Sequence, residues 1–409
     1  MSKRLGLIAV TLLLVAMVVV SGSVLILRVF YTWLLVLVSG YFWVVFTSRG
    51  IGFAAAPLPL RSQAGASILQ QVSVTNKSRL PKSGLQIHAS NDIACGDIST
   101  TLDLPPGKTV TWQAQYDLTR RGRFHLGGFR LSATDPFGLF RREVTEGLSS
   151  EIIVHPMVVP MPPFSLLGLN GSGLSKRMPE ALSASASNIR EYTNGDSLRH
   201  IHWRSTAHTG RYMVKVFDAD RSRHRAENYW VLLDMGTSGH ASQGNDSTAE
   251  YAVALAASLA REYISNGYRF GLITTGGEPK VFPADTSHDH LTNILDTLAI
   301  IEPSGFLSCP ELLARHQGLF GSNSTVIIIT PTTSSSLTES FHQLNSRGCA
   351  AAYFLIDGAD FGGASPSAVG RTLTQLGAPV YVLRRNVNFR QALEQAAGAN
   401  SWFSGAERS

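Results

Sequence analysis

The densest group of charged side chains lies between residues 190 and 225, and its residue types favour the binding of anionic groups. Eight residues of this segment are basic: Arg190, Arg199, Arg204, Arg211, Lys215, Arg221, Arg223 and Arg225. Four are acidic: Glu191, Asp196, Asp218 and Asp220. An arginine guanidinium binds carboxylates and phosphates through parallel N–H donors. The segment could therefore form a contact surface for an acidic partner.

The alternative is an internal lock that holds this loop against a sheet. In such a lock Asp196 accepts hydrogen bonds from an arginine, Gly195 forms the turn, and Trp203 supplies buried apolar bulk. If these side chains are buried, Asp196→Ala or Trp203→Ala should lower the free energy of unfolding by about 2–4 kcal/mol.

Three histidines, His200, His202 and His208, lie in the same segment and could bind a metal ion. Together with Asp234 they are the basis of one alternative function, a metal-dependent hydrolase. Nucleic-acid binding through the basic residues is another alternative. Aromatic residues that could stack on bases are sparse in the segment, however. The sequence contains no Gly-x-Ser-x-Gly motif and no phosphate-binding loop. We therefore predict no catalytic residues.

The elements that must position these residues follow two patterns. From about residue 228, five continuous apolar runs follow one another: Tyr229–Leu233, Phe270–Ile273, Thr325–Ile329, Ala351–Ile356 and Val380–Leu383. They alternate with helical patterns such as Ser247–Ser265 and Phe389–Ala397. Buried strands that alternate with helices predict a doubly wound, mostly parallel α/β sheet. Between residues 62 and 160, apolar and polar side chains alternate with period two, most clearly over Thr109–Leu118. Ile68–Thr75 and Phe124–Ala133 are further predicted strands, and Gly127-Gly128 indicates a bulge or turn in the latter. That pattern predicts a small antiparallel β-sandwich.

The N-terminal part of the chain is typical of a membrane anchor. Leu5–Leu27 and Val29–Ser48 carry no charge and are interrupted only by Arg28. About 20 apolar residues cross a bilayer as a helix, so the stretch predicts a transmembrane hairpin that turns at Ser21–Ser23 or at Arg28. Lys3, Arg4, Arg49 and Arg61 flank the hairpin, and the positive-inside rule then places the soluble part in the cytoplasm.

Composition agrees with an anchored protein. Of the 409 residues, 44% are hydrophobic and only 16% are charged, whereas about 25% is usual for soluble domains. The net charge of +6 is mild and suits anionic lipid better than a dedicated nucleic-acid binder. The three cysteines, Cys95, Cys309 and Cys349, have no metal-ligand spacing.

The segment from 190 to 215 resembles the signature of the bacterial family called domain of unknown function 58. The residues that carry the resemblance are Arg190, Glu191, Tyr192, Gly195, Asp196, Arg199, Ile201, Trp203, Ala207, Val214 and Lys215. Upstream, Arg121-Gly122 and Asp135-Pro136-Phe137-Gly138-Leu139-Phe140 are similar to the run that precedes the signature in that family.

The resemblance implies a membrane-anchored protein with a von Willebrand factor A-like domain. Members are typically encoded near MoxR-type AAA ATPases and, in some genomes, near transglutaminase-like membrane proteins. It therefore implies a non-enzymatic interaction module at the inner membrane, with an AAA ATPase as the expected partner and membrane lipid as its support.

Metal-binding A domains hold Mg²⁺ through Asp-x-Ser-x-Ser after the first strand, a later Thr and a later Asp. Here the first motif is Asp234-Met235-Gly236-Thr237-Ser238, and only Ser308 offers an oxygen in the region of the later Thr. Thr330-Pro331-Thr332 stands where the last Asp is expected. The resemblance thus identifies Asp234, Ser238 and Ser308 as a degenerate Mg²⁺ site, and we expect no cofactor.

The predicted organisation is a hairpin at 1–50, a linker at 51–61, a β-sandwich-like domain at 62–160 and a second linker at 161–189. The family signature segment follows at 190–227, then the von Willebrand factor A-like domain at 228–400 and a tail at 401–409.

Overall fold

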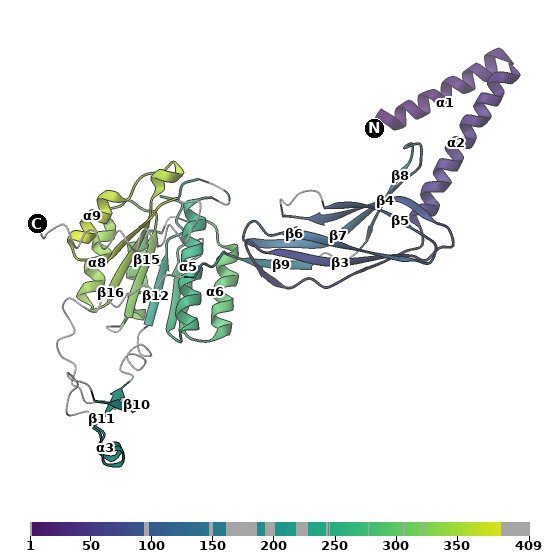
Figure 1. The fold of residues 1–409 in the computed structure, drawn as a ribbon. Helices are drawn as coiled ribbons and strands as arrows, with labels where there is room; N and C mark the ends of the chain where they lie inside the picture. Colours follow the sequence, from purple (N-terminus) through teal and green to yellow (C-terminus); the bar gives the residue numbers. More distant parts are fainter. Residues whose placement is uncertain are drawn as a thin grey trace, which may run out of the picture. The chain divides into compact units, whose positions relative to one another are not determined.

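The computed structural model describes residues 2–93, 98–146, 150–160, 186–192, 201–217 and 228–385, the last range without 243, 245, 277, 306, 322 and 323. The chain forms two compact units, Met1–His155 and Pro156–Ser409 (Figure 1). Each unit is described below by itself.

The first unit begins with two apolar helices, α1 (Ser2–Ser21) and α2 (Val24–Ser48). Gly22 and Ser23 separate them, and Gly22 has a φ of +57° that favours glycine. The break therefore lies at the first of the two predicted turn positions, and Arg28 is inside α2. Among the described residues, α2 is long and apolar enough to cross a membrane, whereas the apolar part of α1, Leu5–Ser21, is shorter.

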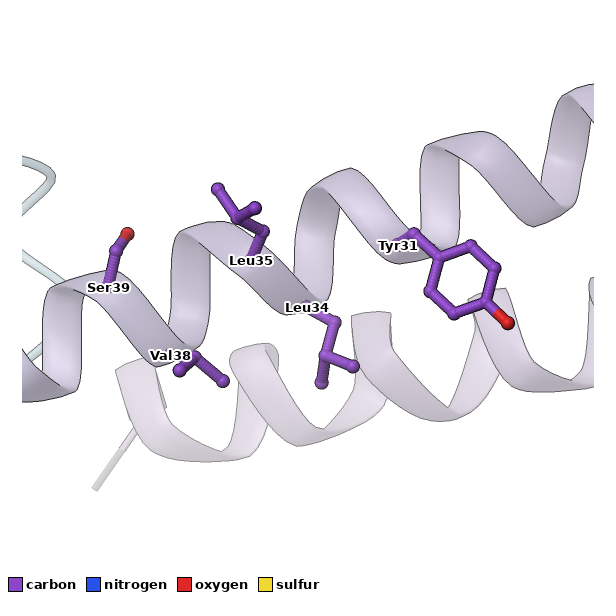
Figure 2. A pocket seen from close by; sticks show the side chains of 5 residues that line it. All are labelled: Tyr31, Leu34, Leu35, Val38 and Ser39. Atoms are coloured by element: carbon purple, nitrogen blue, oxygen red, sulfur yellow. The ribbon is translucent and has the colours of Figure 1, made fainter.

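The surface of α2 is apolar over most of its length. Figure 2 shows a hollow on this helix lined by Tyr31, Leu34, Leu35, Val38 and Ser39. Four of these five side chains are largely hydrocarbon, and they recur at helical spacing on neighbouring turns. Such a surface suits contact with acyl chains rather than with water.

Two sheets form the rest of the first unit. One has the strand order β1-β3-β6, and the other has the order β2-β9-β7-β4-β5, with β8 paired to β7. The strands are β1 (Ile51–Ala55), β2 (Arg61–Gln63), β3 (Ser67–Asn76), β4 (Lys82–Asn91), β5 (Ser99–Leu104), β6 (Thr109–Asp117), β7 (Gly122–Thr134), β8 (Arg141–Glu146) and β9 (Ser150–His155). Side chains of both sheets, such as Val72 of β3 and Ile87 of β4, belong to one hydrophobic core.

The alternating pattern located these strands well. The predicted strands at 68–75, 109–118 and 124–133 coincide with β3, β6 and β7, and the bulge expected at Gly127-Gly128 is present, because the β4–β7 register shifts there. The linker predicted at 51–61 is wrong for its first half. Ile51–Ala55 pairs with β3, and Phe53 packs on Phe129 with 4.9 Å between ring centroids.

A buried lysine joins α2 to the β-sheets. The Lys82 side chain is 1% exposed, and its Nζ donates to the carbonyl oxygens of Phe46, Thr47 and Arg49, at 3.4 Å from Phe46 O and 3.2 Å from Thr47 O. The last carbonyls of a helix have no intrahelical partner, and the ammonium satisfies them. It also places a positive charge at the negative end of the helix dipole. Burial lowers the pKa of Lys82.

The second unit contains one six-stranded sheet with the order β14-β13-β12-β15-β16-β17. All neighbours are parallel except β14, which is antiparallel to β13. The strands are β12 (Asn228–Leu233), β13 (Arg269–Thr274), β14 (Lys280–Asp285), β15 (Ser324–Thr330), β16 (Ala350–Ile356) and β17 (Val380–Leu383). The chain thus builds outward from β12 in both directions, as in doubly wound sheets.

Helices cover both faces of this sheet (Figure 1). α5 (Thr248–Ser265) and α6 (His288–Ile300) contribute to one core cluster, and α7 (Cys309–Arg315), α8 (Ser336–Ser346) and α9 (Ser367–Gln375) contribute to the other. Short 3-10 helices occupy Gln317–Leu319 and Gly358–Phe361. The five predicted strands and the alternation with helices are confirmed. Strand β14 and helix α7 were not predicted, and the helix predicted at 389–397 lies outside the described residues.

A short element precedes the sheet in the chain. β10 (Ala186–Glu191) and β11 (Met213–Phe217) form an antiparallel pair, and α3 (Trp203–Thr209) lies between them in sequence. We call residues 186–192 and 201–217 the excursion. The prediction of a linker at 161–189 is wrong for residues 186–189, which belong to β10, and residues 161–185 lie outside the described part.

The Lys82 contact leads to a prediction. Lys82→Met keeps the apolar stem but removes the donor from three helix-terminal carbonyls, so the free energy of unfolding should fall by about 1–3 kcal/mol. Thermal unfolding of the full-length protein in detergent measures this. Lys77→Met, which changes an exposed lysine, is the control and should leave the melting temperature unchanged. Equal melting temperatures for both variants would contradict the capping role.

Candidate functional site

The carboxyl end of the central strand carries a buried carboxyl group that accepts several hydrogen bonds. Asp234 directly follows β12, whose neighbours are β13 and β15. Because the strand order reverses at β12, with β13 on one side and β15 on the other, this end is where doubly wound folds form their ligand crevice. Asp234 is nevertheless buried, with only 4% of its surface exposed.

Donors from three strand ends surround the Asp234 carboxylate. Thr330 Oγ1, at the end of β15, donates to Oδ2 at 2.7 Å. Thr275 Oγ1, just after β13, donates to Oδ1 at 3.3 Å, and Gly236 N donates to the same oxygen at 3.0 Å. The carboxylate therefore ties the ends of β12, β13 and β15 together.

The two threonine oxygens also accept backbone hydrogen bonds. Met235 N donates to Thr275 Oγ1 at 2.6 Å, and Thr332 N donates to Thr330 Oγ1 at 3.0 Å. Both threonine side chains are completely buried. Each threonine hydroxyl thus accepts a hydrogen bond from a loop amide and donates one to Asp234. Loss of the carboxylate would leave both hydroxyls without an acceptor.

Electrostatics at this position are set by burial. Burial raises the pKa of Asp234, and the hydrogen bonds from Thr330, Gly236 and Thr275 and the nearby His240 oppose the rise. Cys309 is also buried here, and burial together with the Asp234 charge raises the pKa of its thiol well above the usual range. A thiol held in its protonated form is a poor nucleophile.

His240 fixes the loop that follows β12. Its Nε2 lies 3.0 Å from the backbone oxygen of Asp234 and must donate to it, since a carbonyl only accepts. Its Nδ1 lies 3.0 Å from Thr248 Oγ1, in the first turn of α5. The histidine therefore connects the strand end to the helix that covers it.

The three residues of the degenerate metal site have different surroundings in the structure. The segment around Gly305 does lie beside Asp234, because Ser304 N donates to Met235 O at 2.8 Å and Thr237 Oγ1 donates to Gly305 O at 3.1 Å. Ser238, however, is exposed. Ser308 forms the capping box of α7 with Glu311.

These positions do not fit Mg²⁺. That ion requires near-octahedral oxygen geometry, and the Asp234 oxygens already accept hydrogen bonds from the protein. Within the described residues, no group of three His, Cys, Asp or Glu side chains could hold a metal ion. His202, one of the three histidines considered above, instead accepts from Ser205 N at 3.2 Å and caps α3.

The family signature is only partly described. Arg190 and Glu191 lie in β10, Tyr192 follows it, and Lys215 lies in β11. Gly195, Asp196, Arg199 and His200 lie outside the described residues, as do Asp218, Asp220, Arg221, Arg223 and Arg225. The hydrogen bonds Tyr192 N to Tyr212 O (2.8 Å) and His202 N to Met213 O (2.7 Å) hold the excursion together.

Two aromatic side chains of the excursion are exposed. Trp203 is 66% exposed at the start of α3, and Tyr212 is 60% exposed just before β11. The Arg211 guanidinium lies 3.3 Å from Glu191, and Arg204 is exposed on α3. The lock hypothesis is wrong for Trp203, since a tryptophan that supplies buried bulk would be covered.

Sequence reasoning identified Asp234 but missed its partners. Thr275 and Thr330 each stand at the carboxyl end of a predicted strand, next to the strand that Asp234 follows. Hydroxyl residues at neighbouring strand ends were the available signal. His240 gave no comparable signal, because its partners become visible only once the loop from 235 to 248 is folded.

Comparison with known proteins places this chain among relatives of undefined activity. Residues 188–347 match a family model described as "Protein of unknown function DUF58". The uncharacterized protein YeaD of Bacillus subtilis is 26% identical over 189 residues, which cover 45% of this chain and 44% of that protein. The match thus spans less than half the length of this relative.

Similarities to solved structures are weak. A beta-glucosidase from Listeria innocua matches with 13% identity over 25% of this chain and 16% of its own, at a TM-score of 0.19. The CARDB domain of a Pyrococcus furiosus protein matches with 10% identity over 26% of this chain and 94% of its own, also at 0.19. Proximal thread matrix protein 1 of the mussel byssus reaches 0.30, with 16% identity over 42% and 47% of the two chains. Scores this low support no argument about function.

The Asp234 network predicts a specific pH dependence. Because burial raises the pKa of Asp234, the folded protein keeps this proton at pH values where the unfolded chain has lost it. The Asp234 contribution to stability is therefore complete below the unfolded pKa of about 3.9 and declines as the pH rises through the folded pKa. The difference in unfolding free energy between the parent protein and Asp234→Asn should decline over the same range, as measured by denaturant unfolding. A difference that grows with pH would contradict this assignment.

Proposed function

Because the chain belongs to the DUF58 family, we propose that it is a non-enzymatic protein-interaction module tethered to the inner membrane. Its apolar helices are the tether, and the excursion is the contact element for a cytoplasmic partner. The observation that carries this proposal is the exposure of Trp203 and Tyr212, both within the family-matched residues 188–347.

Exposed aromatic and arginine side chains on one small element are typical of binding hot spots. Trp203 and Arg204 stand next to each other in α3, and Arg211 and Tyr212 stand next to each other before β11. A tryptophan exposed to 66% gains apolar contact only when a partner covers it. The arginines favour a partner whose matching surface is acidic.

The sheet end supports a non-enzymatic role. A catalytic carboxylate must reach the proton that it transfers, but Asp234 is buried and accepts from Thr330, Thr275 and Gly236. These contacts suit an anchor for three strands better than a catalytic base or a resident Mg²⁺ ligand. We therefore propose neither a hydrolase nor a resident cofactor, and no nucleic-acid partner.

The second unit fits a von Willebrand factor A-like domain by its strand order. β12 is central, β13 and an antiparallel edge strand β14 lie on one side, and β15, β16 and β17 lie on the other. The family resemblance makes a MoxR-type AAA ATPase the proposed partner, and a transglutaminase-like membrane protein a further component. Recognition through the excursion would leave the buried Asp234 network intact.

The tether is proposed to be a two-helix hairpin with both ends in the cytoplasm. α2 has the length and composition of a membrane span, and Trp33 Nε1 of α2 donates to Thr11 Oγ1 of α1 at 3.1 Å. Lys3 and Arg4 lie in the first turn of α1, Arg49 follows α2, and Arg28 lies near the connecting turn. The positive-inside rule then favours cytoplasmic ends.

Binding measurements test the contact element. Full-length protein in nanodiscs should bind a MoxR-type AAA ATPase from the same organism, and Trp203→Ala or Tyr212→Ala should weaken binding about tenfold or more, because hot-spot residues contribute about 2 kcal/mol each. Biolayer interferometry gives the dissociation constants. The control Leu376→Ala, a partly exposed leucine of the same unit, should bind like the parent.

Thermal unfolding of the same variants distinguishes the two hypotheses for the signature. Trp203→Ala should keep the melting temperature of the parent, because the side chain is exposed. Unchanged affinity would contradict the contact role. Weaker binding together with a lower melting temperature would mean that the Ala variant loses affinity because the fold is destabilised, which would also contradict the contact role.

Reporter fusions test the orientation of the tether. Alkaline phosphatase, which is active only in the periplasm, should be inactive when fused after Ser409, and a green fluorescent protein fused there should be fluorescent. Active phosphatase at this position would mean that the chain crosses the membrane an odd number of times.

A further inference from the structure

The turn between β7 and β8 meets α2 well before the end of that helix. A Cβ atom on Gly40 would lie 3.3 Å from Asp135 Oδ2 and 3.3 Å from the Phe140 ring. The rings of Tyr41 and Phe140 make an edge contact, with 6.1 Å between centroids. Glycine at position 40 therefore permits a close approach of the helix to this turn.

Asp135 shapes the turn. The carboxylate is buried and accepts from Phe140 N at 2.6 Å and from Phe137 N at 3.1 Å. Gly138 takes a φ of +68°. One phenylalanine, Phe140, thus packs on α2, while Phe137 at the tip is 61% exposed. The Asp135-Pro136-Phe137-Gly138 motif builds a rigid turn that presents an apolar side chain to its surroundings.

The position along α2 gives the depth of this turn. From Val24 to Gly40 the helix is about 25 Å long at 1.5 Å per residue, close to the roughly 30 Å thickness of a hydrocarbon core. The remaining residues to Ser48 add about 12 Å and include exposed Tyr41, Trp43 and Phe46. Aromatic residues of this kind gather at the membrane–water interface.

Basic residues follow where lipid headgroups would lie. Lys77 N donates to Gly50 O at 2.8 Å, and Asn76 N donates to Lys108 O at 3.0 Å, so two further turns stand at the end of α2. They carry the exposed cations Lys77, Arg79 and Lys108. Three acidic groups described at this end have partners within the unit: Asp103 accepts from Gly84 N, Asp135 accepts from Phe140 N, and Glu143 pairs with Arg141.

We propose that the turn from Asp135 to Phe140 is a second membrane contact, with Phe137 entering the interfacial layer of the bilayer that α2 crosses. The order of residue types along α2 supports this inference. The apolar span comes first, the exposed aromatic residues follow at the level of the turn, and the exposed cations come last, at the level of anionic headgroups. Since Lys82 caps α2, the turn keeps a fixed depth relative to the span. The inference rests on the proposed membrane tether.

Photo-crosslinking tests this contact. In full-length protein, Phe137 is replaced with p-benzoylphenylalanine, and the protein is placed in phosphatidylcholine–phosphatidylglycerol nanodiscs and irradiated. Intact-mass spectrometry should show an added phospholipid mass. The control position is Leu60, which is 73% exposed. Its backbone oxygen accepts from Ile153 N of β9, near the first residues of β7. At 3.3 Å per strand residue, this position is about 40 Å from Phe137, which lies beyond the other end of β7. It should give no lipid adduct.

A parallel wash separates this inference from the tether. Protein that stays in proteoliposomes through an alkaline carbonate wash but forms no more lipid adduct at 137 than at 60 overturns the second contact and leaves the tether standing. Protein that is released by the wash overturns the tether, and the second contact with it. Retention together with an adduct specific to position 137 supports both.

Discussion

The ammonium group of Lys82 fixes how the first unit is built. It lies at the end of α2 and satisfies helix carbonyls that would otherwise be buried without a donor. Only Arg49 and Gly50 separate α2 from β1, so no linker of useful length intervenes. The sheets are therefore held at the end of the apolar helix. If α2 crosses a bilayer, the sheets must lie directly at the bilayer surface.

A buried carboxyl group organises the second unit in a related way. Asp234 gathers the ends of three parallel strands through Thr275, Thr330 and a backbone amide. In many doubly wound folds this position faces a ligand. Here the carboxyl oxygens of Asp234 instead accept hydrogen bonds from the protein itself. The proposed partner contact therefore uses exposed side chains elsewhere, and Trp203 and Tyr212 are the most exposed aromatic residues described in this unit.

The sequence predicted regular elements better than it predicted contacts. Strand β6 followed from strict alternation, and the central strands of the large sheet followed from continuous apolar runs, because burial imposes these patterns locally. The sequence did not predict strand β1, because its Gly and Ala residues lack a strand signal. Its pairing with β3 is a long-range contact.

For the sites, the residue types were informative but their burial was not. Asp234 was identified from its place after a strand, yet only the fold shows that Thr330 donates to it. One of the two hypotheses for the signature placed Trp203 inside a lock, but the structure exposes this side chain. The sequence did not mark Lys82 as a buried residue. A buried lysine in an alternating strand looks the same in sequence as a solvated one, and only the position of α2 in the fold distinguishes them.

Hydrogen–deuterium exchange tests the central claim most directly. Full-length protein in nanodiscs would be compared alone and with the proposed AAA ATPase. Backbone amides from 201 to 217 should exchange more slowly in the complex, while exchange of those from 234 to 240 and from 304 to 308 should be unchanged. Slower exchange confined to the sheet end, with the excursion unaffected, would contradict this claim and would make the Asp234 end of the sheet the binding site.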